Sequence, residues 1–365
     1  MAELADVFRL HGPAYLDKYG KNILPSHRRV MWDVLACRTE VMDGHVYRCP
    51  QCLQDRYVYH SCKNRHCPKC QNDQADLWLA KQQRLLLPVT YFMVTFTLPA
   101  EFRSVVRSHQ KDLYNLMFRA SSAALQKLAQ DPRHIGGALG MLGVLQTWKR
   151  DLGYHPHIHY IIPGGGLRAD GLWRSSKNDY LVPEKALTII YRAKIRDGLK
   201  ALKLYDRIPE AIWKTNWCVD IEPVASGQEA LKYLTPYIFR VAISNRNILA
   251  VDTKTVTFRY RDAKTGQYVP LTLPAGQFIG RFLQHVLPKG FQKVRTYGLY
   301  HPKQRRELKL VKEQLRPKDC KTTVEALPTS TPVKAPPVRF ICPCCHVDMI
   351  RIGKVINKRG PPLSW

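Results

Sequence analysis

The sequence predicts an α+β fold in which helices pack on a central antiparallel sheet, joined to a thiol-rich N-terminal module. Between residues 71 and 315, strand candidates at 89–98, 143–148 and 157–162 alternate with helix candidates at 101–130, 183–202 and 227–239. The module is indicated by closely spaced cysteines that leave little room for a core of their own. With 365 residues, the chain is long enough for two or three domains.

Changes in composition along the sequence predict five segments. Residues 1–36 look helical, with an apolar stripe that Pro13 interrupts. The stripe consists of Leu4, Phe8, Tyr15, Leu16 and Tyr19. The thiol-rich module spans 37–70 and the main domain 71–315. Residues 316–340 are rich in Pro, Thr and Lys and predict a tether, and residues 341–365 form a cysteine-containing tail.

The charge of the chain indicates a polyanionic partner. Lys and Arg number 57 against 29 Asp and Glu, giving a formal net charge of +28. Nucleic acid is the partner that such an excess favours. Residues 1–12 lack an apolar core and residues 85–100 are too short to span a bilayer, so we expect a cytoplasmic protein without a membrane partner.

The cysteines predict metal thiolates, because they cluster in C-x-x-C pairs. The first expected zinc site combines Cys49, Cys52, Cys67 and Cys70, and a possible second zinc would use Cys37, His45, Cys62 and His66. Eight donors can be partitioned in several ways, so the pairing stays open. A single further knuckle at Cys342 to Cys345 could recruit Cys320 or His346. Basic residues around the module make DNA contact and a purely structural zinc equally plausible.

A second metal site is indicated by the segment from Tyr154 to Tyr160. Alternation along a strand places His157 and His159 on one face, with Ile158 on the other. Gln146 on the preceding strand candidate is the expected third ligand. Imidazoles favour zinc or manganese whereas magnesium prefers oxygen, so the residues leave the metal open. The competing interpretation is a polar, solvent-facing strand.

Two tyrosines supply candidate nucleophiles. Ser226 and Glu229 form a capping box that starts a helix, and Tyr233 and Tyr237 then stand one turn apart on one side of it. Pro236 should kink this helix. Together with a metal site, the pair suggests phosphodiester cleavage through a phosphotyrosine, with Lys232 or Arg240 favouring the phenolate. Ordinary core packing of an aromatic pair is the alternative.

Aromatic and basic residues interleave between residues 278 and 306. Bases stack on aromatic faces and cations follow phosphates, so this pattern fits single-strand binding, although a basic face over an ordinary core fits equally well. The aromatic members are Phe278, Phe282, Phe291, Tyr297 and Tyr300. The expected DNA contacts are Lys232, Arg240, Lys289, Lys293 and Arg295.

These residues resemble the rolling-circle HUH transposases, specifically the two-tyrosine insertion-sequence group called the IS91 family. Four ordered motifs carry the resemblance: the zinc segment at 61–70, the histidine motif continued through Pro163-Gly164-Gly165-Gly166, the tyrosine segment at 233–245, and the segment at 281–291. The resemblance implies an HUH endonuclease palm with a central antiparallel sheet. It implies that His157 and His159 bind Mg²⁺ or Mn²⁺ and that the tyrosines attack single-stranded DNA, leaving a 5′-phosphotyrosine and a free 3′-hydroxyl.

We therefore expect a DNA transposase that nicks and joins single strands at transposon ends and target in the bacterial cytoplasm, associated with the nucleoid. No G-x-x-x-x-G-K-[ST] segment occurs, so a host helicase would open the strands. Two alternatives remain open: an HUH replication initiator or relaxase, and a non-catalytic zinc-dependent DNA-binding protein.

Overall fold

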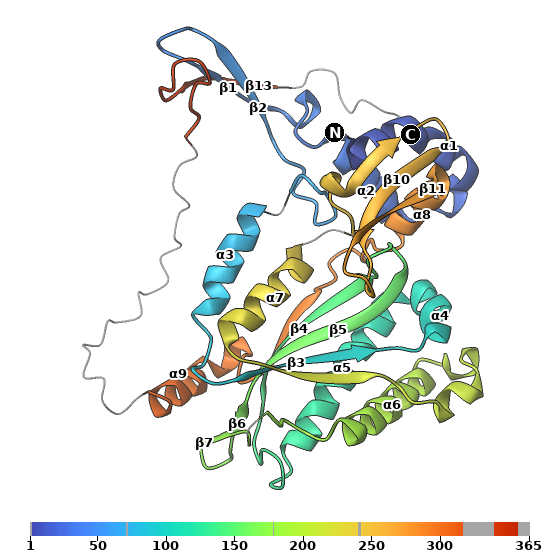
Figure 1. The fold of residues 1–365 in the computed structure, drawn as a ribbon, viewed down its shortest axis with the longest axis vertical. Coiled ribbons are helices and arrows are strands. Elements are labelled where there is room, and N and C mark those ends of the chain that lie inside the picture. Colours follow the sequence, from blue (N-terminus) through green and yellow to red (C-terminus); the bar gives the residue numbers. More distant parts are fainter. Residues whose placement is uncertain (1, 71, 178, 240–241, 317–338, 357–365) are drawn as a thin grey trace.

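The computed structural model describes residues 2–70, 72–177, 179–239, 242–316 and 339–356. Helices surround a five-stranded antiparallel sheet, and smaller antiparallel sheets lie beside it (Figure 1). This arrangement confirms the predicted α+β class.

The central sheet has the strand order β12-β4-β5-β3-β8. Its strands are β12 (Val294–Gly298), β4 (Gly140–Trp148), β5 (Tyr154–Pro163), β3 (Tyr91–Thr97) and β8 (Val219–Val224). β5 is the middle strand and is paired on both sides, with His159 opposite Val144 of β4 and Thr95 of β3. The same register places His157 opposite Gln146. The three strands predicted from sequence all lie in this sheet.

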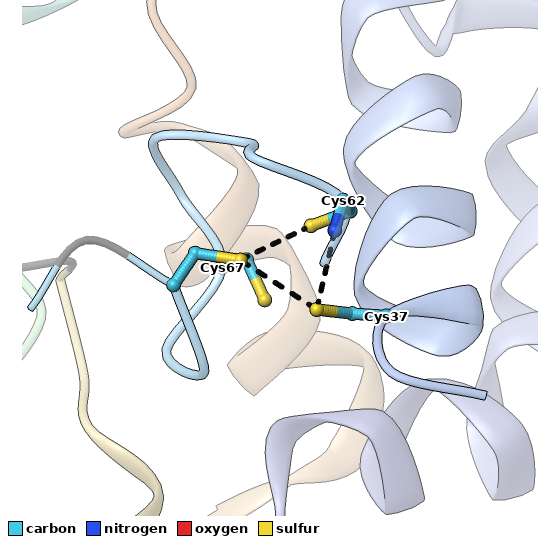
Figure 2. A group of neighbouring side chains, drawn as sticks. Cys37, Cys62 and Cys67 are labelled. Carbon is cyan, nitrogen blue, oxygen red and sulfur yellow. Dashed lines mark hydrogen bonds between the residues drawn. The ribbon is translucent and has the colours of Figure 1, made fainter. Parts of the chain in front are cut away.

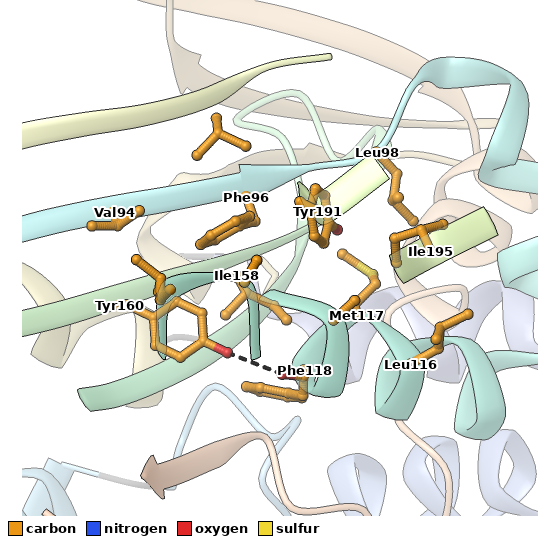
Figure 3. Close-up of a cluster of buried hydrophobic side chains, with 14 of the residues drawn as sticks. Val94, Phe96, Leu98, Leu116, Met117, Phe118, Ile158, Tyr160, Tyr191 and Ile195 are labelled. Carbon is orange, nitrogen blue, oxygen red and sulfur yellow. Dashed lines mark hydrogen bonds between the residues drawn. The ribbon is translucent and has the colours of Figure 1, made fainter. Parts of the chain in front are cut away.

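Helices α4 (Arg103–Ser108), α5 (Gln110–Ala129) and α6 (Glu184–Ala201) belong to the largest buried core. Buried residues recur every three or four positions along α5, as expected for a helix with one apolar face. The buried residues of α5 pack with Phe96 of β3 and with Ile158 and Tyr160, the β5 residues that alternate with the histidines (Figure 3). The single helix predicted at 101–130 is interrupted at His109, whose backbone leaves the helical region with φ −128° and ψ 45°.

The opposite, histidine-bearing face of the sheet is covered by α7 (Gly227–Phe239) and α9 (Arg305–Gln314), and α3 (Asn72–Gln83) packs against α7. Leu234 and Ile238 of α7 share a buried cluster with Val144 and Ile161 of the sheet. Gly227 lies against Tyr91, where an added Cβ would sit 2.7 Å from the Tyr91 ring. The absence of a side chain at Gly227 therefore allows α7 to start directly above the first residue of β3.

A second core joins the N-terminal helices to the chain beyond α7. Its elements are α1 (Leu4–Tyr19), α2 (Pro25–Ala36), β9 (Ile248–Val251), β10 (Thr255–Arg261), β11 (Tyr268–Pro274) and α8 (Ala275–Leu283). Phe8 of α1 packs edge-on against Phe282 of α8, with ring centroids 5.7 Å apart. α1 continues through Pro13, so the predicted interruption of the stripe does not end the helix. The β9-β10-β11 sheet was not predicted from the sequence.

The thiol-rich module contributes a third sheet of β1 (Gly44–Arg48), β2 (Asp55–Tyr59) and β13 (Ile350–Val355), in the order β13-β1-β2. The segment set apart as a C-terminal tail is thus partly a strand of the module's sheet. The expected tether lies almost wholly outside the described residues.

A two-stranded hairpin, β6 (Gly165–Leu167) with β7 (Trp173–Ser175), follows β5. It explains part of the glycine run: Gly165 has φ +149°, and a Cβ there would lie 2.5 Å from Trp173. Short 3-10 helices complete the described chain at Gly20–Asn22, Glu40–Met42, Ala100–Phe102, Tyr205–Arg207, Glu210–Lys214, Asn245–Asn247 and Pro302–Gln304. None of the helices in the described ranges combines the length and apolarity that crossing a bilayer requires.

Two buried histidines outside the central site should make stability depend on pH. His285 donates Nε2–H to the Leu152 carbonyl (3.1 Å), so its Nδ1 accepts from the Thr147 hydroxyl (3.2 Å) in the neutral ring. Burial lowers the pKa of His285 to about 3 and that of His27 to about 4. The unfolded chain therefore binds more protons than the folded one between pH 6.5 and these values, and stability is lost as the pH falls below 6.5.

We expect each such histidine to remove up to about 1.4 kcal/mol of unfolding free energy per pH unit in this window. Urea unfolding at pH 7 and pH 5 would measure the loss, and His285→Gln should reduce it. Comparing the two proteins removes contributions that both share, such as protonation of cysteines. An unchanged pH dependence in the variant would show that His285 does not titrate in this way.

Candidate active site and metal centres

The site is built on the middle strand of the central sheet. His157 and His159 project from the same face of β5, with ring centroids 4.7 Å apart, and both are less than 10% exposed. His157 Nδ1 lies 2.7 Å from the His155 carbonyl oxygen. A carbonyl can only accept, so Nδ1 carries the proton and Nε2 holds the lone pair that a metal ligand needs.

Thr95 on the neighbouring strand fixes the second imidazole. Its Oγ1 lies 3.0 Å from His159 Nδ1. When Nδ1 donates to this hydroxyl, Nε2 carries the lone pair, which is the tautomer shown for His157. Thr95 was not predicted from the sequence; a polar residue on the strand that pairs with the histidine strand was the available signal.

Burial keeps these imidazoles neutral. It lowers the pKa of His157, and it lowers the pKa of His159 to about 3, with a smaller contribution from the proximity of His157. The same cause lowers the pKa of His155 to about 4. Neutral imidazoles bind metal ions without having to lose a proton first, so the site is prepared for a cation near neutral pH.

Gln146 offers an oxygen donor beside the two histidines. It lies directly opposite His157 across the β4–β5 pair and is 8% exposed. Its amide nitrogen donates to the Trp148 carbonyl at 3.0 Å, whereas Oε1 is buried and has no hydrogen-bond partner among the described residues. A buried acceptor without a donor is costly. A divalent cation held by two imidazoles and this oxygen fits the donor set.

The tyrosine helix lies over the same face. The capping hydrogen bond is present, with the Glu229 amide donating to Ser226 Oγ at 3.2 Å. Tyr233 is 48% exposed, so it is not part of the packed interior. Position 237 is within α7, although the Tyr237 side chain and Arg240 lie outside the described residues. Lys232 is exposed.

The interleaved aromatic and basic stretch proves to be mainly core. Phe278, Phe282 and Phe291 are buried, and Tyr300 bonds Tyr91 inside the protein, hydroxyl to hydroxyl at 2.6 Å. These rings cannot stack on bases, which corrects the single-strand-binding interpretation of this stretch. Only long-range packing separates an aromatic core from a stacking platform, since the two have the same composition.

Two of the expected DNA-contacting cations are engaged internally. The Arg295 guanidinium stacks on the rings of Phe118 and Phe291, 4.3 and 5.1 Å from their centroids, and bonds Asn115 Oδ1 at 2.5 Å. Lys293 lies 5.6 Å from the Trp148 ring centroid, and burial followed by the charge of Arg65 lowers its pKa to about 7. These contacts argue against Arg295 and Lys293 as DNA contacts. Lys289 is exposed.

The cysteines group differently from the expected pairing. Cys37, Cys62, Cys67 and Cys70 bring four sulfurs within 4.8 Å of one another, and Figure 2 shows three of them at the end of α2. A second group combines Cys49 and Cys52 with Cys342 and Cys345. The predicted set of Cys49, Cys52, Cys67 and Cys70 is therefore wrong, because its two knuckles belong to different groups.

The two histidines assigned to a second zinc are also corrected. His66 Nε2 lies 3.3 Å from the Leu287 amide nitrogen, which donates to it, and His45 packs edge-on against His60. Neither belongs to a cysteine group. The partners of Cys342 were missed. The Cys-Pro-x-Cys pattern gave no signal for this pairing, because it begins at Cys67 as well as at Cys49 and Cys342.

Several cations of the module are also paired with protein groups. Arg48 bonds Asp55 at 2.7 Å, Lys69 bonds Glu3 at 2.6 Å, and Arg65 donates to the Phe291 carbonyl at 2.7 Å. These contacts favour a structural role for this part of the module.

Comparisons with known proteins agree with this architecture. A family model described as "Putative transposase" matches residues 140–307, which include both histidines and both tyrosines. A second, "Transposase zinc-binding domain", matches residues 7–98. The chain is 34% identical to "Putative transposase y4qJ" of Sinorhizobium fredii, over 100% of this chain and 98% of the relative. It is 25% identical to the transposase for insertion sequence element IS801 of Pseudomonas savastanoi pv. phaseolicola, over 73% and 68%. No solved structure matches the chain.

Proposed function

Because the chain belongs to the IS91 family of insertion-sequence transposases, we propose that it cleaves and rejoins single-stranded DNA at transposon ends and target by rolling-circle transposition. Tyr233 and Tyr237 are the nucleophiles, and His157, His159 and Gln146 hold a divalent cation. The observation that carries the proposal is that the tyrosine helix covers the same sheet face as the two buried histidines.

The level of the tyrosines along the sheet supports this assignment. β8 ends opposite Tyr91, and α7 starts above Tyr91 and runs back beside β4 and β5 (Figure 1). Ten residues of helix carry position 237 about 15 Å from Gly227. Thr95, the partner of His159, lies about 13 Å along β3 from Tyr91. Ile238, the next residue after position 237, shares a buried cluster with Val144, which lies opposite His159 across the β4–β5 pair.

Positions 233 and 237 lie at different angles around the α7 axis, and so at different distances from the sheet. At about 100° per residue, position 237 falls between position 233 and the buried row that contains Leu234 and Ile238. Position 237 thus lies nearer the sheet than position 233, and Tyr233 lies nearer solvent. Such a difference suits one nucleophile that acts over the metal site and one that engages a second DNA strand.

The reaction conserves the energy of the phosphodiester. A tyrosine Oη attacks the phosphorus and loses its proton to solvent or a base, the bond from phosphorus to the 3′-oxygen breaks, and the departing 3′-oxygen takes up a proton. The products are a 5′-phosphotyrosine and a 3′-hydroxyl, which can attack the new ester in the reverse sense. A bound Mg²⁺ or Mn²⁺ would supply Lewis-acid polarisation of the phosphoryl oxygens. The neutral imidazoles and Gln146 Oε1 would hold that ion without cancelling its charge.

DNA contact is proposed for the exposed cations Lys232 and Lys289, with the net charge of +28 supplying the general attraction. Strand opening falls to a host helicase. A replication initiator or relaxase would share the chemistry, but the two relatives compared with the chain are both named as transposases.

The test uses end-labelled single-stranded oligonucleotides that carry the element's own ends, incubated with the protein and Mg²⁺ or Mn²⁺. A denaturation-resistant adduct should retain a 3′ label, whereas a 5′-labelled strand should give a shorter free product, because the protein stays on the 5′-phosphate. The Tyr233→Phe, Tyr237→Phe double variant should form no adduct. Tyr180→Phe is the matched control, since Tyr180 is similarly exposed at 46%.

An adduct that persists in the double variant would place the nucleophile elsewhere. No adduct with any metal on either strand would support a non-catalytic zinc-dependent DNA-binding protein instead.

A further inference from the structure

The second cysteine group joins the two ends of the described chain. Cys49 and Cys52 follow β1, whereas Cys342 and Cys345 precede β13, and 290 residues separate Cys52 from Cys342. We propose that these four cysteines form a second tetrathiolate zinc site, a split zinc ribbon that fastens residues 339–356 to the N-terminal module. The matched zinc-binding domain ends at residue 98 and so does not contain Cys342 or Cys345.

The two halves of the group have the same local structure. In the first, the Leu53 amide donates to the Cys49 carbonyl (3.0 Å) and the Cys49 amide to the Gln54 carbonyl (3.0 Å). In the second, the His346 amide donates to the Cys342 carbonyl (3.0 Å) and the Cys342 amide to the Val347 carbonyl (2.9 Å).

Both loops also turn at the same place. The residue after each second cysteine is left-handed, with φ 58° at Leu53 and φ 53° at His346. Neither residue is a glycine, so each loop holds a side chain in a conformation that is usually unfavourable. Two separate segments thus adopt one knuckle geometry, and their four sulfurs lie within 4.8 Å of one another.

Sulfur spacing fits a metal better than a disulfide. Zinc–sulfur bonds of about 2.3 Å in a tetrahedron place sulfurs about 3.8 Å apart. The Cys52 and Cys342 sulfurs are 3.6 Å apart, as are those of Cys37 and Cys70 in the other group. A disulfide needs about 2.05 Å. The two groups therefore share the spacing expected of zinc thiolates.

The surrounding core is too small to hold the segment alone. Cys49, Cys342 and Met349 are its buried members, with Tyr47 and Phe340 packed at the edge, 4.4 Å between ring centroids. β13 adds backbone hydrogen bonds to β1, but its side chains are mostly exposed. A structural zinc supplies folding free energy where apolar burial is scarce. Zinc at this site would make residues 339–356 an integral part of the module.

The first test counts metal in the full-length protein. We expect two zinc ions per chain by native mass spectrometry for the wild type, and one for the Cys342→Ser, Cys345→Ser double variant. Cys344→Ser is the matched control: Cys344 lies in the same knuckle, is exposed, and is not in the group, so it should keep two. One zinc in the wild type, or two in the double variant, would overturn the proposal.

The second test measures the connection itself and does not depend on how well a variant folds. A specific protease site is placed within 317–338 of the wild-type protein, and the chain is cleaved there. The C-terminal fragment should co-elute with the body in size-exclusion chromatography and separate after zinc is chelated. Separation in zinc-replete buffer, or co-elution after complete zinc removal, would contradict the split ribbon. Cobalt substitution gives an independent check, because thiolate-to-cobalt absorption per chain should halve in the double variant.

Discussion

Replacing His157 with alanine is expected to lower single-turnover cleavage of single-stranded DNA by at least about 10³-fold while leaving DNA affinity within a few-fold of the wild type. Lewis-acid stabilisation contributes several kcal/mol, and each 1.36 kcal/mol is a factor of ten in rate. Phosphate contacts elsewhere provide the affinity. Cleavage would be followed on denaturing gels with Mg²⁺ or Mn²⁺, and binding by fluorescence anisotropy over a range of salt concentrations.

His155→Ala is the control in the same strand. Its ring lies 5.2 Å from that of His157, centroid to centroid, but it is outside the proposed ligand set. We expect its cleavage rate to fall far less. Parallel loss of cleavage and binding in His157→Ala, accompanied by a lower melting temperature, would show instead that the imidazoles are structural.

Cys37→Ser is expected to have the largest effect on stability, by unfolding the N-terminal part of the molecule. Cys37 is fully buried at the end of α2, and Cys37, Cys67 and Cys70 belong to the same core as Phe8 and Phe282. Structural zinc contributes on the order of 10 kcal/mol in small zinc domains. Losing one of four ligands should therefore release both the metal and the packing of α1 and α2 against α8.

Limited proteolysis with zinc analysis would measure this effect. The variant should lose zinc and be cleaved rapidly within residues 1–70, whereas Cys218→Ser, an exposed cysteine outside both groups, should behave as the wild type. Protease resistance retained after the zinc is gone would contradict the proposed role. The Cys342→Ser, Cys345→Ser variant should keep the first zinc, so the two sites can be separated.

Features encoded over a few residues could be predicted. Alternation placed His157 and His159 on one strand face, and spacing at 226–229 located the start of α7. These predictions hold because backbone geometry alone fixes which neighbours in sequence share a face or a cap. The internal break at His109 was not predicted, because the apolar pattern continues across it.

Features that depend on distant partners could not be predicted in the same way. The aromatic residues after residue 278 matched a stacking platform in composition, yet Phe282 packs against Phe8, far back in the sequence. Arg295 was predicted to contact DNA, but its guanidinium lies against the rings of Phe118 and Phe291. Whether a side chain is buried depends on the residues that pack over it, and these residues come from distant parts of the chain.

The sequence by itself determined the chemistry available to this protein: paired imidazoles, paired phenols, cysteine knuckles and a large positive charge. Tertiary structure alone decided which donors meet. It joined Cys49 and Cys52 to Cys342 and Cys345, and it laid the tyrosine helix over the histidine face. The physical reason is that local spacing fixes the geometry within one turn or knuckle, whereas the pairing of such units depends on strand register and core packing over hundreds of residues.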